Sequence, residues 1–112
     1  TAIIGGSKIS TKLLLLENLI EIFDTLVIAG AMANSFLFAR GYNLGKSLVE
    51  KNLIDSSIRI MEKSKKIGTN LILPIDVVCS QNLNDVKNIK LVDVNNVLPD
   101  HMILYPYCIS YK

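Results

Sequence analysis

Continuous apolar runs alternate with segments of helical spacing along the first two-thirds of the chain. The runs lack alternating polar residues, which is typical of parallel strands buried on both faces; they lie at residues 2–4, 25–29 and 70–73. Between them, apolar residues recur at intervals of three and four, which predicts helices over residues 8–23, 31–40 and 54–67.

This order predicts an α/β fold, a three-layer Rossmann-like parallel sheet with helices on both faces. The sheet would be incomplete and would be followed by a C-terminal antiparallel strand or hairpin. Residues 82–98 are rich in Asn and Asp and predict a turn and that strand, and residues 76–79 are expected to be an extended edge. Residues 101–112 show no clear period.

The first strand runs into two glycines and then two lysines four residues apart. If Ser7 or Ser10 caps the following helix, Lys8 and Lys12 lie near one face of its first turns. A helix N-terminus attracts anions, so this arrangement would suit a polyphosphate. The alternative is a tight turn at Gly5-Gly6 with two solvated lysines.

Right-handed crossovers would bring the turns after the first and second strands to the same sheet edge. Residues 5–8 and 29–31 would then form one cleft outside the carboxyl ends of the strands, where ligands of such sheets bind. Small residues at both turns would leave room for a flat ring. The combination favours a nucleotide.

The segment Gly41–Ser47 looks superficially like a phosphate-binding P-loop. Only three residues separate Gly41 from Gly45, where that motif needs four, and the segment follows a predicted helix rather than a strand. We therefore expect a surface loop that turns at its glycines.

Composition and charge limit the kinds of binding partner that the sequence supports. The net charge of +2 is too small to indicate nucleic acid, and the apolar stretch 25–39 is shorter than the ~20 residues that span a bilayer. Two distant cysteines, Cys79 and Cys108, suggest a reducing intracellular compartment, and no Cys/His set for a metal is present. His101 is expected to be a surface histidine.

Four segments together resemble the first half of the C-terminal, nucleotide-binding domain of phosphoglycerate kinase: residues 3–12, 28–36, 45–48 and 73–78. They occur in the order and spacing of that family, and the resemblance covers residues 2 to about 104. It implies one partial domain over residues 1–104 and a divergent tail over residues 105–112. Because Thr1 is not Met and stands directly before a strand, we expect a piece of a longer protein.

The resemblance implies phosphoryl transfer between 1,3-bisphosphoglycerate and ADP, giving 3-phosphoglycerate and ATP, with Mg²⁺, in a monomeric cytoplasmic glycolytic enzyme. The lysine matching Lys8 would reach the transferring phosphoryl group. The implied nucleotide-binding residues are Gly6, Ser7, Lys8, Lys12, Gly30, Ala31 and Leu48.

One departure from the family's pattern, and the sites that lie outside this chain, limit what the resemblance implies. The family usually carries three glycines where this chain has Ala29-Gly30-Ala31, and added methyl groups could crowd the base or tighten packing. The 3-phosphoglycerate site, the Mg²⁺ ligand and the ribose-holding glutamate would lie outside this chain, so we expect no kinase activity from it alone. The alternatives are a non-catalytic module that binds nucleotide or pairs through an open sheet edge, and a degenerate truncated product.

Overall fold

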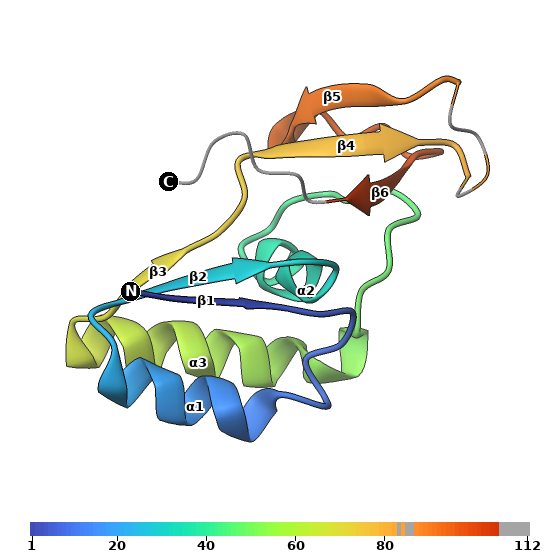
Figure 1. Ribbon diagram of the computed structural model, residues 1–112. Helices are drawn as coiled ribbons and strands as arrows, with labels where there is room; N and C mark the ends of the chain where they lie inside the picture. The colour runs from blue at the N-terminus through green and yellow to red at the C-terminus, as the bar shows by residue number, and fades with distance from the viewer. Residues whose placement is uncertain (83, 85–86, 106–112) are drawn as a thin grey trace.

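Two three-stranded sheets, one parallel and one antiparallel, share a hydrophobic core (Figure 1). The computed structural model describes residues 1–82, 84 and 87–105. The parallel sheet has the order β1-β2-β3 and the antiparallel sheet the order β5-β4-β6. Their strands are β1 (Ala2–Gly5), β2 (Thr25–Ala29), β3 (Asn70–Ile72), β4 (Asp76–Ser80), β5 (Lys90–Asp93) and β6 (Met102–Tyr105).

The helices connect the parallel strands. They are α1 (Leu13–Ile22), α2 (Met32–Ala39) and α3 (Ile54–Ile67), with short 3₁₀ turns at η1 (Lys51–Leu53) and η2 (Val94–Asn96). Figure 1 shows α1 and α3 side by side on the same face of the parallel sheet, and α2 packs against α3 and β2. No helix in the described part of the chain is long and apolar enough to cross a bilayer.

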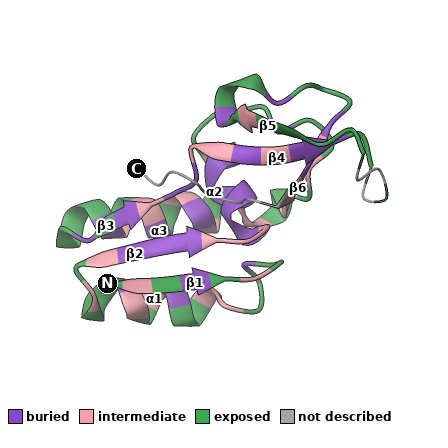
Figure 2. Ribbon diagram, turned by 45° about the horizontal axis from the view of Figure 1, so that its top comes forward, coloured by how far each residue is buried: buried purple, intermediate pink, exposed green. Residues whose placement is uncertain are grey.

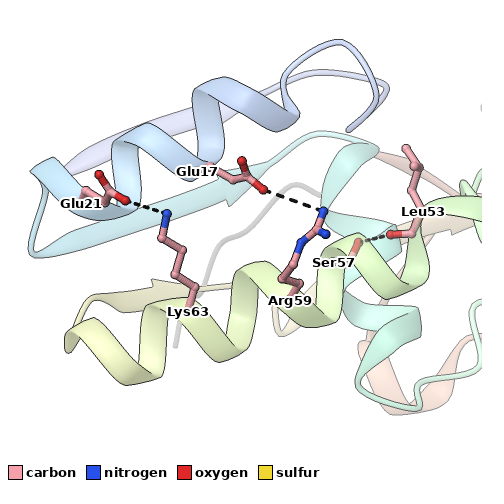
Figure 3. Close-up of polar contacts among 6 residues, drawn as sticks. All are labelled: Glu17, Glu21, Leu53, Ser57, Arg59 and Lys63. Atoms are coloured by element: carbon pink, nitrogen blue, oxygen red, sulfur yellow. Dashed lines mark hydrogen bonds and ion pairs between the residues drawn. The ribbon is translucent and has the colours of Figure 1, made fainter.

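Two ion pairs join the exposed sides of α1 and α3 (Figure 3). The ammonium of Lys63 lies 2.7 Å from the Glu21 carboxylate, and the Arg59 guanidinium lies 3.9 Å from Glu17. Such solvent-exposed pairs contribute less than about 1 kcal/mol each. Burial of Leu16, Ile20 and Ile60 beneath them therefore contributes more to the packing of these helices.

β1 and β2 differ in burial: β2 is mostly buried, whereas β1 has buried, intermediate and exposed residues (Figure 2). β2 lies between two strands and its three middle residues are buried, as its apolar run predicts. β1 is an edge strand: Ile4 is buried in the hydrophobic core, whereas Ile3, on the opposite face, is 75% exposed. The expectation that β1 is buried on both faces is therefore wrong for this chain.

The predicted α/β class is confirmed, with a parallel sheet followed by antiparallel strands. Several boundaries are corrected. The first helix begins at Leu13 rather than at residue 8, and β4, expected as an edge, is the central strand of its sheet. β6 lies in the segment 101–112, where the sequence shows no clear period. Its partner β4 is more than twenty positions away, so no local pattern signals the pairing. Residues 106–112, most of the predicted tail, lie outside the described residues.

Candidate nucleotide site

The turns after β1 and β2 touch through their backbones at the carboxyl end of the parallel sheet. The Met32 amide donates to the Gly6 carbonyl at 3.0 Å. Gly30 has a φ of +75°, and a Cβ on it would stand 2.5 Å from the Gly6 oxygen and 2.7 Å from the Gly6 nitrogen. The prediction that these two turns are neighbours is confirmed, and only glycine fits at position 30.

The side chain of Lys12 folds back over the first of these turns. Its Nζ donates to the Gly5 carbonyl, and a Cβ built on Gly6 would lie 3.1 Å from that ammonium. An amine thus sits at the end of β1, beside the backbone contact between the turns. A positive charge in that place suits an anionic group.

The local structure around Lys12 differs from the predicted one. Lys12 itself is the N-cap residue of α1, without a side-chain cap hydrogen bond. Neither Ser7 nor Ser10 caps the helix, so Lys8 lies in the preceding loop rather than in the first helical turn. The two lysines are therefore presented by a loop and a helix start, and the shared helical face is not formed.

Lys8 has a restrained backbone and an exposed side chain. Its carbonyl accepts from the Thr11 hydroxyl at 3.1 Å. The amides of Ile9 and Ser10 donate to one Glu50 carboxylate oxygen, at 2.5 and 3.3 Å. Within the described residues the Lys8 ammonium has no ion pair, which leaves its charge available to a ligand.

Leu48 belongs to a segment that α2 holds in place. The amide nitrogen of the buried Asn34 side chain donates to the Leu48 carbonyl at 3.0 Å, and the Glu50 amide donates to the Ser35 hydroxyl at 3.3 Å. The Leu48 side chain is 52% exposed, so an apolar surface is presented close to the start of α2. Glu50 was missed by sequence reasoning because nothing local to it signals a contact with residues 9 and 10.

The two alanines at the second turn occupy ordinary positions. A Cβ on Gly5 would lie 3.7 Å from the Ala29 Cβ, an ordinary van der Waals distance, and Ala31 has a φ of −63°. Of the three positions, only Gly30 has the left-handed backbone and the close approach that require glycine. The methyl groups therefore cause no strain in the turn itself.

Gly45, the second glycine of the P-loop-like segment, allows this loop to pack closely against the residues before β6. Gly45 has a φ of +60°, and a Cβ there would overlap the carbonyl oxygens of Leu98 and His101. The Lys46 amide donates to the same His101 oxygen at 2.8 Å. The loop is thus pressed against the segment before β6, which agrees with a structural loop.

His101 is buried, with 7% of its surface exposed, so the expectation of a surface histidine is wrong. Its ring Nδ1 lies 2.9 Å from an Asp100 carboxylate oxygen. A hydrogen bond from this ring lowers the pKa of Asp100, and the Gln81 side chain, which donates to the other oxygen, adds to the effect. Through Gln81, Asp100 also links the loop before β6 to the residue that follows β4.

Two further features of the described residues bear on ligands. No group of three or more His, Cys, Asp or Glu side chains gathers there that could hold a metal ion.

A cavity of about 470 Å³ lies at the end of the parallel sheet opposite to the candidate site, between α2, α3 and the start of β3, where Ala39, Met61 and Leu71 line it. None of the predicted nucleotide residues lines that cavity, so it is separate from the candidate site.

The candidate site therefore contains two glycine turns in contact, an ammonium beside them, an exposed second lysine and an exposed leucine. The ammonium groups fit phosphate oxygens, and glycine at positions 6 and 30 allows the two turns and the Lys12 side chain to approach one another closely. Residues from β1 to the loop before η1 contribute to it.

Comparison with known proteins identifies similar chains. The sequence model of the family described as Phosphoglycerate kinase matches residues 1–105. The chain is 47% identical over 102 residues to the phosphoglycerate kinase of Caulobacter vibrioides, covering 91% of this chain and 26% of that protein. It is 41% identical over 101 residues to that of Helicobacter pylori, covering 90% of this chain and 25% of that protein.

A solved structure shows the same arrangement. The phosphoglycerate kinase from Coxiella burnetii superposes with a TM-score of 0.87 at 38% sequence identity, over 91% of this chain and 26% of that chain. The chain thus spans about a quarter of the length of the proteins it matches.

Proposed function

Because the chain belongs to the phosphoglycerate kinase family, we propose that it forms the nucleotide-holding part of a glycolytic kinase. That kinase would transfer a phosphoryl group between 1,3-bisphosphoglycerate and ADP, giving 3-phosphoglycerate and ATP. The chain would supply part of the ADP/ATP site and none of the 3-phosphoglycerate site. The working enzyme would be a cytoplasmic monomer of family length.

One observation carries this proposal most strongly. Gly6 and Gly30, far apart in sequence, touch through their backbones at the carboxyl end of the parallel strands, and the Lys12 ammonium lies over Gly6. Ligands of such sheets bind outside the carboxyl ends of the strands. Bare backbone suits the close approach of a flat base, and the amine suits its phosphates.

Each residue then has a role that its position supports. Gly6 with Ser7 and Gly30 with Ala31 would flank the adenine, and the exposed Leu48 would pack near it. Lys12 would bind nucleotide phosphate from beside the first turn. Lys8, whose side chain is exposed, would be the catalytic residue that neutralises charge on the transferring phosphoryl group.

Phosphoryl transfer depends mostly on positioning and on charge neutralisation, which two ammonium groups supply in part. Mg²⁺, when bound with the nucleotide, would add further neutralisation of phosphate charge. Its protein ligand is expected outside this chain. Because the second substrate also binds elsewhere, we expect the 112 residues alone to show no turnover in a coupled assay.

Titration of the chain with Mg·ADP tests the proposed site. We expect chemical-shift changes at the amides of Gly6 and Lys8, and about tenfold weaker binding in Lys12→Ala, because a hydrogen bond to a charged group is lost. Lys66→Ala removes the same charge from an exposed position on α3 and is the matched control. Absence of shifts in the parent chain, or equal weakening in both variants, would contradict the proposal.

A second candidate is an interaction module that pairs through β1. Within the described residues β1 hydrogen-bonds to a strand only on its β2 side, and Ile3 beside that open edge is 75% exposed. Unpaired strand edges with apolar side chains promote association. Sedimentation at increasing concentration would show self-association that Ile3→Lys abolishes; a concentration-independent monomer would rule this candidate out.

A further inference from the structure

We infer that Glu50 is a positioning residue of the nucleotide site: its carboxylate fixes the backbone after Lys8 and so directs the Lys8 ammonium. This inference rests on the proposed function, because it assigns a role within that same site. Glu50 touches neither lysine side chain in the contacts described above, so it would act through the loop alone.

The contact between Glu50 and the loop joins segments that are 41 positions apart. One carboxylate oxygen accepts from the Ile9 amide at 2.5 Å and from the Ser10 amide at 3.3 Å. The Ile9 side chain is fully buried in the core. Because the core anchors Ile9, an anionic ligand is poorly placed to displace the Glu50 carboxylate from the two amides. The contact therefore fits a structural clamp on the loop better than an anion-binding site that Glu50 happens to fill.

Glu50 is itself held from α2. Its amide donates to the hydroxyl of Ser35, and the Leu48 carbonyl two residues earlier accepts from Asn34. Both of those side chains are buried in the first turns of α2. The clamp thus connects Lys8 to the helix that begins directly after the Gly30 turn, so both sides of the candidate site share one support.

The direction in which Mg·ADP affinity changes when the Glu50 carboxylate is removed distinguishes a positioning role from electrostatic repulsion. A carboxylate near an anion site repels phosphate, so removing its charge would strengthen Mg·ADP binding if charge dominated. If positioning dominates, removing the carboxylate weakens binding because the loop that carries Lys8 is no longer restrained. A neutral amide retains an oxygen that can accept the same two hydrogen bonds.

The experiment compares Glu50→Ala, Glu50→Gln and the control Glu62→Ala, which removes an exposed carboxylate of α3. Hydrogen exchange at the Ile9 and Ser10 amides reports the clamp, and Mg·ADP titration by amide shifts reports binding. We expect faster exchange at both amides and about 3- to 10-fold weaker binding in Glu50→Ala. Glu50→Gln should bind within about twofold of the parent, since its oxygen still accepts both bonds, and Glu62→Ala should match the parent in both measurements.

The outcomes distinguish this inference from the proposed function. If the parent chain does not bind Mg·ADP, the proposed function fails, and the role of Glu50 fails with it. If the parent binds and Glu50→Ala binds equally well or more tightly, only the role of Glu50 is overturned. Tighter binding in both Glu50 variants would identify electrostatic repulsion as the dominant effect and would likewise overturn it.

Discussion

Replacing Gly30 with alanine tests the backbone contact on which the candidate site depends. At a φ of +75° the alanine would have to adopt a left-handed backbone conformation, and its Cβ would stand 2.5 Å from the Gly6 oxygen. The left-handed conformation costs a non-glycine residue about 1–2 kcal/mol. Overpacking against the Gly6 backbone adds about 1–3 kcal/mol, because neither turn has a flexible side chain that could move aside.

Gly41 provides the matched control. Its φ is +95°, but nothing lies within 4 Å of a Cβ built on it, so Gly41→Ala carries the conformational cost without the steric one. The entropy that alanine removes from the unfolded chain is the same in both variants and cancels. The free energy of unfolding of Gly30→Ala should therefore lie about 1–3 kcal/mol below that of Gly41→Ala.

Urea denaturation followed by circular dichroism measures this difference. With a denaturant slope of about 1–2 kcal/mol/M, the two midpoints should be separated by about 1 M, the Gly30→Ala midpoint being the lower. Equal midpoints would refute the contact between the turns. In folded Gly30→Ala, Mg·ADP binding should also be weaker than in Gly41→Ala, since the two turns would be pushed apart.

Three further predictions concern the core and its titrating groups. Phe36→Ala should lower the free energy of unfolding by about 3–5 kcal/mol in urea denaturation, because Phe36 is fully buried. Burial raises the pKa of Cys79 to about 11 from 9.0, so at pH 8 its thiolate fraction falls by a factor on the order of 100. In a Cys108→Ser background, alkylation of Cys79 in the folded chain should be slower than in the urea-unfolded chain by at least that factor. The lowered pKa of Asp100 means that its stabilising contribution is present above the unfolded value near 3.8 and is lost as pH falls through the folded value; an NMR titration should place the Asp100 midpoint below 3.8, and His101→Gln should raise it.

The location of the candidate site was largely predictable, and its internal geometry was not. Small residues after two apolar strands, together with right-handed crossovers, predicted that the Gly6 and Gly30 turns meet. The helix start was placed wrongly because residues 8–12 have helical spacing of polar groups, whereas the buried Ile9 and the Glu50 carboxylate hold the loop in another conformation. Glu50 could not be found at all, since its partners are about forty positions away.

The sequence by itself determined the α/β class, the three parallel strands and the three helices that join them, because periodicity and glycine turns are local properties that a segment carries with it. Only the tertiary structure decided that Lys12 folds over Gly6, that β1 exposes Ile3, and that β6 pairs with β4. These features depend on which distant segments are present to pack against them. A contact between separate segments leaves no regular pattern in either one, so only the folded chain contains it.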